Sequence, residues 1–273
     1  MRMAHTDPNR YGQSTHVHGG AGTIRFLSLW NSDAFETPWL FVHRAELPPK
    51  TGIGYHAHDT CEEMFTILDN AARFMHNGNT AELNGPVTVP CRAGEAHGIY
   101  NHTNKPTQFM NFCVVSPGGS YDCRDFGENL VNAVPGPADK LPVGRFDRAL
   151  LSKASGVHHG KGELGFRRVW SAEDFKTTWG FVDHILLPPD SSIGYHRHDT
   201  IEECYIILAG SGRMTVDGET ELVVTGDAIP NKLGGAHGIY NHTQDNLEVL
   251  NMAVFMEKGK SDSTDLLDDL AGR

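Results

Sequence analysis

Long hydrophobic runs are missing from this 273-residue sequence, and no stretch approaches the 18 or more apolar residues of a membrane-spanning helix. Basic residues are scarce as well, with 23 Lys and Arg against 34 Asp and Glu, which gives a net charge of −11. So acidic a chain has little general attraction for nucleic-acid phosphates or anionic lipid. We therefore expect neither a nucleic acid nor a membrane among its partners.

Cysteine is also rare, with five residues, and the first 20 residues are polar and lack the apolar segment of a signal peptide. We therefore expect reduced thiols and a cytoplasmic protein. Hydrophobic residues make up 39% and charged residues 21% of the chain, which is typical of an ordinary globular protein rather than a disordered one.

Histidine, in contrast, is abundant, with 16 residues. Residues 53–68 read IGYHAHDTCEEMFTIL and residues 193–208 read IGYHRHDTIEECYIIL, so eleven of sixteen positions are identical at an offset of 140. The octapeptide AHGIYNHT occurs at 96–103 and, at the same offset, at 236–243. Because a long period of self-similarity indicates a repeated structural unit, we predict two domains, residues 1–135 and 136–273.

Each repeat consists of short, β-rich apolar runs separated by turns. Asn77-Gly78 and Asp217-Gly218 are typical of two-residue hairpin turns. We predict an all-β fold in which short antiparallel strands close into a sandwich or barrel in each half. The segment 116–156 is interpreted as a connector with one short helix, and a short amphipathic helix is expected at residues 266–270.

A group of metal-binding residue types recurs in both repeats. In the second repeat, His196 and His198 are two positions apart and so share one face of a strand. A carboxylate follows after a turn at Asp199-Thr200, and His237 comes later, within reach of a following hairpin. Three imidazoles and one carboxylate suit a divalent transition metal and leave one or two positions for water or substrate. The donor set alone does not choose among Fe, Mn, Ni, Cu and Zn.

These residues resemble the two motifs of the cupin superfamily: His-x-His, three or four residues, Glu, six residues and Gly, then Pro, Gly, His and Asn. The match departs at Asn70, which replaces the motif Gly of the first repeat, and in a Pro-to-Gly spacing of three residues in both repeats. The resemblance covers about residues 18–113 and 158–253 and implies two tandem jelly-roll barrels, a bicupin.

The resemblance also selects one carboxylate of each Glu-Glu pair as a ligand, by its distance from the motif Gly position. The adjacent Glu62 and Glu202 are expected to face solvent or to support the ligands. The implied metal ligands are His56, His58, Glu63 and His97 in the first repeat and His196, His198, Glu203 and His237 in the second.

Further candidates come from strand alternation and from repetition. Counted from each Glu ligand, the inward positions include Arg73 and Arg213, so we expect a guanidinium in each cavity, with a surface position as the alternative. Both resemble the substrate-pocket arginine of oxalate decarboxylases, and a guanidinium beside a cation suits a bound carboxylate or enolate. Other repeated residues are candidate acids or bases, or packing groups around the imidazoles. They are Tyr55, Tyr195, His102 and His242, while His18 and His158 are candidates for the cavity rim.

Taken together, these features favour a metal-dependent enzyme acting on a small, oxygenated, anionic substrate, and within that class we favour a dioxygenase. A decarboxylase and an isomerase or cyclase are the alternatives among enzymes. A non-catalytic bicupin that binds a small molecule is the alternative from another class. Complete ligand sets in both halves favour catalysis, and whether copies of the chain form a homo-oligomer is left open.

Overall fold

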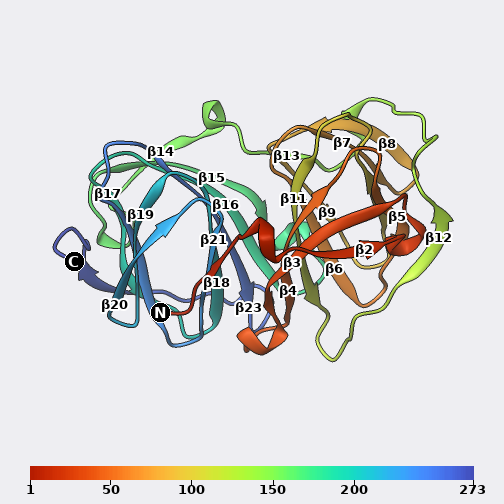
Figure 1. The fold of residues 1–273 in the computed structure, drawn as a ribbon. Coiled ribbons are helices and arrows are strands. Elements are labelled where there is room, and N and C mark those ends of the chain that lie inside the picture. Colours follow the sequence, from red (N-terminus) through yellow and green to blue (C-terminus); the bar gives the residue numbers. More distant parts are fainter.

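The computed structural model describes residues 1–273 as two β-barrels of twelve strands each, lying side by side (Figure 1). Each barrel consists of a seven-stranded and a five-stranded antiparallel sheet. The chain has no α-helix, and none of its helical turns has the length and hydropathy of a membrane span. The prediction of an all-β protein with two tandem jelly-roll barrels is confirmed.

The N-terminal barrel has the strand orders β13-β9-β6-β11-β4-β3-β2 and β12-β5-β10-β7-β8. Its strands are β2 (Gly12–Thr15), β3 (Thr23–Asn31), β4 (Trp39–Leu47), β5 (Gly52–Ala57), β6 (Cys61–Ile67), β7 (Ala71–His76), β8 (Asn79–Asn84), β9 (Val87–Cys91), β10 (Ala96–Tyr100), β11 (Thr107–Val115), β12 (Arg124–Glu128) and β13 (Gly144–Arg145).

The C-terminal barrel repeats this plan with the orders β1-β21-β18-β23-β16-β15-β14 and β20-β19-β22-β17-β24. Its strands are β1 (Ala4–His5), β14 (Ser152–Ser155), β15 (Glu163–Ser171), β16 (Trp179–Leu187), β17 (Ser191–Arg197), β18 (Ile201–Ala209), β19 (Ser211–Val216), β20 (Glu219–Val224), β21 (Asp227–Asn231), β22 (Ala236–Asn241), β23 (Leu247–Phe255) and β24 (Thr264–Asp268).

Seven 3₁₀ helices of three residues connect these strands: η1 (Pro8–Arg10), η2 (Val17–Gly19), η3 (Ser32–Ala34), η4 (Ala138–Lys140), η5 (Arg148–Leu150), η6 (Val157–His159) and η7 (Ala172–Asp174). The hairpin predictions at Asn77-Gly78 and Asp217-Gly218 are confirmed, since both residues of each turn have positive φ. The predicted helix at residues 266–270 is wrong, because this segment pairs with β17 as strand β24. The segment 116–156, predicted as a connector with one short helix, instead contains the strands β12, β13 and β14 and the two 3₁₀ turns η4 and η5.

The first strand of each repeat pairs with the opposite barrel. Strand β1 lies against β21, with Ala4 opposite Ala228, and β13 lies against β9, with Gly144 opposite Thr88. The N-terminus therefore lies on the barrel formed by the C-terminal half (Figure 1). The division of the chain between residues 135 and 136 stays a prediction.

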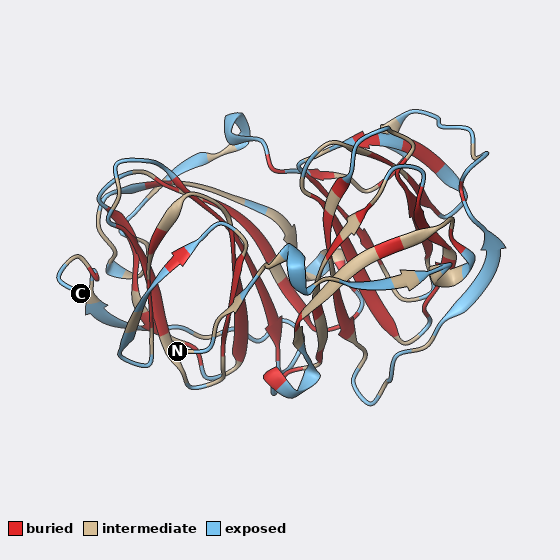
Figure 2. Cartoon of the chain, in the orientation of Figure 1, coloured by how far each residue is buried: buried red, intermediate tan, exposed pale blue.

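Apolar side chains from both barrels form one core where the two seven-stranded sheets meet. Trp39 and Trp179, equivalent in the two repeats, are fully buried, with ring centroids 5.0 Å apart. Figure 2 shows buried residues along the strands of both barrels, including those that meet at the junction. This shared core fixes the two barrels relative to each other.

Glu62 and Glu202 lie at this junction and are fully buried, so the expectation that they face solvent is wrong. Glu62 accepts hydrogen bonds from the backbone N–H of Lys176 at 2.7 Å and from the N–H and hydroxyl of Thr177. Glu202 of the other barrel likewise accepts hydrogen bonds from the backbone N–H of Glu36 and from the N–H and hydroxyl of Thr37. Each barrel thus supplies a buried acceptor to a loop of the other.

Candidate metal centres

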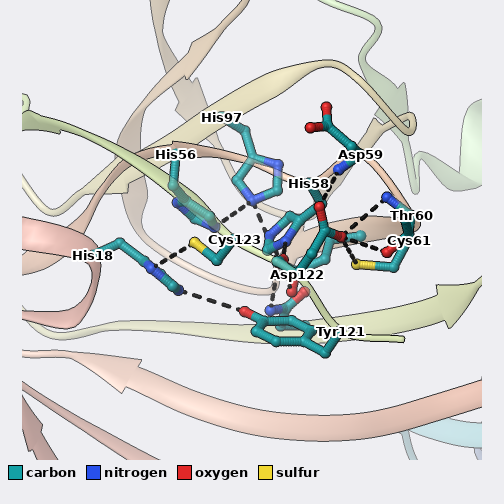
Figure 3. A network of polar contacts seen from close by, with 12 residues as sticks. His18, His56, His58, Asp59, Thr60, Cys61, His97, Tyr121, Asp122 and Cys123 are labelled. Atoms are coloured by element: carbon teal, nitrogen blue, oxygen red, sulfur yellow. Dashed lines mark hydrogen bonds and ion pairs between the residues drawn. The ribbon is translucent and has the colours of Figure 1, made fainter. Parts of the chain in front are cut away.

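The N-terminal barrel gathers His56, His58, Glu63 and His97 into one buried cluster whose ligand atoms all lie within 4.8 Å of one another. Strands β5 and β10 pair so that His56 lies opposite His97, and β6 contributes Glu63. The two Nε2 atoms of His56 and His97 are 3.0 Å apart, and Glu63 Oε2 is 3.3 Å from His97 Nε2. Figure 3 shows the three imidazoles converging on a common point.

The C-terminal barrel forms the same cluster from His196, His198, Glu203 and His237. His196 on β17 lies opposite His237 on β22, and β18 contributes Glu203. The distance from His237 Nε2 to Glu203 Oε2 is 2.9 Å, and that from His198 Nε2 to Glu203 Oε1 is 3.7 Å. Both predicted ligand sets therefore come together, each from two strands of the smaller sheet and one of the larger, with His58 and His198 one residue beyond the ends of β5 and β17.

Electrostatics places His56, His196 and both glutamates in the protonation states that a metal needs, whereas the hydrogen bond with Cys61 and the charge of Glu63 outweigh burial and raise the pKa of His58 to about 9. Burial lowers the pKa of His56 and of His196 to about 2, with the neighbouring histidines adding to the effect, so both rings are neutral. Burial alone would raise the pKa of Glu63 and Glu203, but the surrounding histidines lower it instead, so both carboxylates are ionised. Neutral imidazoles and an ionised carboxylate are the metal-binding forms of these side chains.

Hydrogen bonds orient the imidazoles with Nε2 toward the cluster. The Nδ1–H of His56 donates to Gly54 O at 2.8 Å, and that of His196 donates to Gly194 O at the same distance. His58 donates to the carbonyl of Asp122, as His198 does to that of Asp262. The Nε2 atoms of His58 and His198 are buried without a hydrogen-bond partner. A buried, unpaired nitrogen aimed into a ring of donors is the arrangement that a bound cation satisfies.

A segment that we call the strap, residues 116–128 in the first repeat and 256–268 in the second, crosses each cluster. In the first strap, the Asp122 carboxylate accepts from the backbone N–H groups of Asp59 and Thr60 at 2.7 and 3.0 Å. His18 stacks on His56 with a centroid distance of 3.9 Å (Figure 3), and its Nδ1 lies 2.8 Å from Asp125 Oδ1.

The second strap repeats these contacts. His158 stacks on His196 at 3.7 Å and its Nδ1 lies 2.7 Å from Asp265 Oδ1. His18 and His158 also line the cavities beside the clusters. His18 and His158 each stack on a metal-ligand histidine and pair with a strap aspartate, so they hold both the ligand imidazole and the strap in place.

A cavity opens beside each cluster inside its barrel. The N-terminal cavity has a volume of about 360 Å³ and is lined by His56 and Glu63 of the cluster. The C-terminal cavity has a volume of about 320 Å³ and is lined by His198 and Glu203. Both volumes fall at the lower end of the range for small-molecule sites.

The predicted cavity arginines lie elsewhere, so this prediction is wrong. Arg73 Nη1 donates to the backbone carbonyls of Leu130 and Val131, and Arg213 donates to that of Ala271. The alternation of inward and outward positions changes at the turn before β7 and β19, where Asn70 and Gly210 have positive φ. After these turns the residues flanking each arginine point into the barrel: Ala72 and Phe74 in one barrel, Gly212 and Met214 in the other.

The other four candidates for acid–base roles also lie outside the two cavities. The ring of Tyr55 packs near Phe126, and the Tyr195 hydroxyl accepts from the backbone N–H of Gly218 at 2.9 Å. His102 lies 3.5 Å from Glu82, and His242 is exposed. The cavity walls instead contain residues that the sequence did not single out: His43, Asn111 and Tyr121 in the first barrel and Arg168, Asp183 and Asn251 in the second.

Two jelly-roll barrels in one chain, each with a buried cluster of three histidines and one glutamate, define a bicupin. The cupin domain model matches residues 183–253. The oxalate-binding protein of Thermotoga maritima is 30% identical over 104 residues, which are 38% of this chain and 86% of that protein. The chain belongs to the cupin superfamily.

Solved structures of two other proteins share the fold over most of the chain. Salicylate 1,2-dioxygenase from Pseudoaminobacter salicylatoxidans, solved as adducts with gentisate, is 12% identical with a TM-score of 0.67, covering 84% of this chain and 73% of that one. The oxalate decarboxylase of Bacillus subtilis, which has Mn(II) centres, is 14% identical with a TM-score of 0.64, covering 96% of this chain and 79% of that one.

Proposed function

We propose that the chain is a metal-dependent dioxygenase that acts on a small, oxygenated, anionic substrate. The observation that carries the proposal is that each buried three-histidine, one-glutamate cluster opens on a cavity of small-molecule size. Four protein donors leave room for substrate in the coordination sphere of a first-row metal. The similarity in fold to a salicylate 1,2-dioxygenase, solved as adducts with gentisate, supports the same reaction class.

When a metal ion is bound, it supplies Lewis acidity and, if it is redox-active, a place for dioxygen. The residues of the chain contribute binding, orientation and exclusion of water. In the N-terminal cavity, Asn111 donates from Nδ2 to Glu63 Oε2 at 3.0 Å and so fixes the ligand carboxylate. Phe26, Phe41 and Tyr121 form an aromatic wall that keeps bulk water from the cluster and suits an organic substrate.

A metal-dependent decarboxylase is the second candidate, and one observation favours it. Asp183 lines the C-terminal cavity, and burial raises its pKa to about 6, against the opposing effect of Arg168. A carboxyl group whose pKa is about 6 can take up and release a proton close to neutral pH, which suits the protonation step that follows loss of carbon dioxide. The structural likeness to an oxalate decarboxylase supports this candidate too.

Oxygen uptake and carbon dioxide release distinguish these functions. Protein loaded with Fe(II), Mn(II), Cu(II) or Zn(II) is supplied with catechols, β-diketones, 2-oxo acids and oxalate. We expect oxygen uptake with a redox metal and none with zinc. We expect oxygen uptake to be lost in His56→Ala if the N-terminal barrel is active and in His196→Ala if the C-terminal barrel is active, and to be reduced in each variant if both are active. His5→Ala is the matched control, since His5 is an exposed histidine of β1, remote from both cavities.

The remaining outcomes identify the alternatives. Carbon dioxide release without oxygen uptake identifies the decarboxylase, and conversion without either gas change identifies an isomerase or cyclase. Ligand binding with no turnover under any metal identifies a non-catalytic binding bicupin and overturns the proposal.

A further inference from the structure

One row of side chains crosses the larger sheet of each barrel beside the metal cluster. In the C-terminal barrel the register places Arg168 of β15 opposite Asp183 of β16, then Asn251 of β23 and Tyr205 of β18. In the N-terminal barrel the equivalent residues are Ser28, His43, Asn111 and Phe65. Only the asparagine is common to both rows, so the same position in the fold presents different chemistry to each cavity.

The C-terminal row contains a charged pair held in a fixed geometry. Arg168 donates from Nε and Nη2 to the two carboxylate oxygens of Asp183, at 2.9 and 2.8 Å, and its guanidinium lies 4.3 Å from the ring of Phe181. Asp183 is 3% exposed. A buried carboxylate needs a partner, and Nε and Nη2 of the Arg168 guanidinium supply it. The third nitrogen, Nη1, has no hydrogen-bond partner in the protein. Arg168 lines the cavity, and its side chain is 47% exposed, which leaves room for a ligand at this remaining donor.

Asn251 adds an acceptor to the same wall. It is 4% exposed and lines the cavity, and its Oδ1 is buried without a hydrogen-bond partner. A buried acceptor left unpaired is costly, and a hydroxyl or N–H group of a ligand would remove that cost. The wall therefore offers one free cationic donor and one free acceptor beside Glu203 of the metal cluster.

The N-terminal row offers no cation. His43 stacks on Phe41 at 4.0 Å, and burial lowers its pKa to about 4, so the ring is neutral at physiological pH. Glu63 is the one Asp, Glu, Lys or Arg among the residues lining this cavity, and aromatic side chains dominate the rest of the wall. A ligand with a carboxylate finds no guanidinium here.

We infer that the two cavities select different ligands: the C-terminal cavity takes a carboxylate that carries a neighbouring hydrogen-bond donor, such as a 2-hydroxy acid, and the N-terminal cavity takes an uncharged, largely apolar ligand. Arg168 Nη1 binds the carboxylate and Asn251 Oδ1 accepts from the hydroxyl. The inference rests on the proposed function only in placing the ligand beside a bound metal. It assigns Arg168 as the residue that distinguishes the two cavities and Asn251 as a ligand-positioning residue, since the equivalent Asn111 Oδ1 is also buried without a partner.

Calorimetric binding to zinc-loaded protein tests this without any turnover. The probes are mandelate, phenylacetate, which lacks the hydroxyl, and 1-phenylethane-1,2-diol, which lacks the carboxylate. We expect mandelate to bind most tightly. The double variant Arg168→Ser/Asp183→His, which installs the serine and histidine of the N-terminal row, should weaken mandelate by about 10- to 100-fold and leave the diol unchanged. Asn251→Ala should remove the preference for mandelate over phenylacetate.

Two further variants secure the result. Arg167→Ser removes the adjacent guanidinium, which donates to the carbonyl of Arg145 outside the cavity, and should bind all probes as the wild type does. The reverse exchange, Ser28→Arg/His43→Asp, should create a second mandelate site per chain even if the first double variant folds poorly. Mandelate binding that is unchanged by both exchanges, or weakened equally by Arg167→Ser, would overturn the inference. Because zinc supports no oxidation, failure of the dioxygenase assay leaves this result independent.

Discussion

The two barrels hold the same metal-binding frame but surround it with different atoms. Four of the five cysteines lie in the N-terminal barrel, where Cys61 is close to His58 and Asp122, and the hydrogen bond with Cys113 and the nearby His58 lower the pKa of Cys61 to about 6. The equivalent of Cys61 in the C-terminal barrel is Ile201. Likewise, Cys123 Sγ lies 3.1 Å from His18, whereas the equivalent Ser263 lies 3.3 Å from His158.

This difference separates two kinds of residue. The ligands, the stacked histidines and the strap aspartates are identical in both halves, because any change there would disturb the cluster itself. Some wall residues, such as His43 and the equivalent Asp183, and the nearby thiols differ, because they contact what enters the cavity rather than the metal. The residues that are identical in the two repeats therefore build each metal centre, and the residues that differ determine which ligand each cavity selects.

The largest expected effect is on metal content, and it tests whether the two frames are equivalent. His56→Ala and His196→Ala each remove one nitrogen from a four-donor cluster, so each should reduce bound metal from about two to about one ion per chain. Element analysis after dialysis measures this, with His5→Ala as the control. Loss of both ions from one variant would show that the barrels are coupled, and two ions retained in both variants would refute the ligand assignment.

The second prediction concerns the reciprocal contacts of Glu62 and Glu202. Replacing either glutamate by Ala leaves two backbone N–H groups and a threonine hydroxyl of the other barrel without their acceptor. We expect each variant to lose about 3 kcal/mol of unfolding free energy, by a similar amount because the contacts are mirrored. Urea unfolding measures the loss, with the exposed Glu173→Ala as control. A small loss in one variant alone would show that the junction is asymmetric.

The repeat made the fold and the ligand sets predictable, because His-x-His spacing, turns and strand alternation are local properties of the sequence. Strand alternation failed for Arg73 and Arg213 because it does not continue through a turn with positive φ at Asn70 or Gly210. The role of Glu62 could not be predicted, since its partners lie more than 110 residues away in the other barrel. Arg168 escaped notice because a search for repeats discards residues that differ between the halves.

The third prediction compares His43 and Asp183, which occupy the same place in the two rows and should respond to acid in opposite ways. Burial lowers the pKa of His43 from 6.5 to about 4. Between these values only the unfolded chain binds the proton, so this group reduces stability as the pH falls from 6.5 to 4. Burial raises the pKa of Asp183 from 3.8 to about 6. Here the folded chain binds the proton first, and this group increases stability as the pH falls from 6 to 3.8.

Replacing each group should therefore change the pH dependence with opposite sign. Relative to wild type, His43→Gln should gain about 2 kcal/mol of unfolding free energy on going from pH 7 to pH 4, and Asp183→Asn should lose about as much. Urea unfolding at intervals of pH measures both. Other groups also titrate between pH 7 and pH 4, so the quantity compared is the difference between each variant and wild type. Equal slopes for the two variants would show that burial does not control these residues.

The smallest expected effects are those of Arg73→Ala and Arg213→Ala. Arg73 donates to two backbone carbonyls beyond the first strap and pairs with Glu82 at 3.2 Å, whereas Arg213 donates to one carbonyl beyond the second, at 3.4 Å. Loss of these contacts should cost about 1 kcal/mol in the first barrel and less in the second. Amide hydrogen exchange should then speed up at residues 129–133 in Arg73→Ala more than at residues 269–273 in Arg213→Ala.

Metal content and mandelate binding should stay at wild-type levels in both arginine variants, because neither guanidinium reaches a cavity. Arg124→Ala serves as the control, since Arg124 lies on β12 with its side chain 59% exposed. A loss of carboxylate binding in Arg213→Ala without faster amide hydrogen exchange would instead show that Arg213 lies in the cavity wall. It would also remove the reason for assigning carboxylate recognition to Arg168. The pair of measurements therefore decides which guanidinium of the C-terminal barrel meets the ligand.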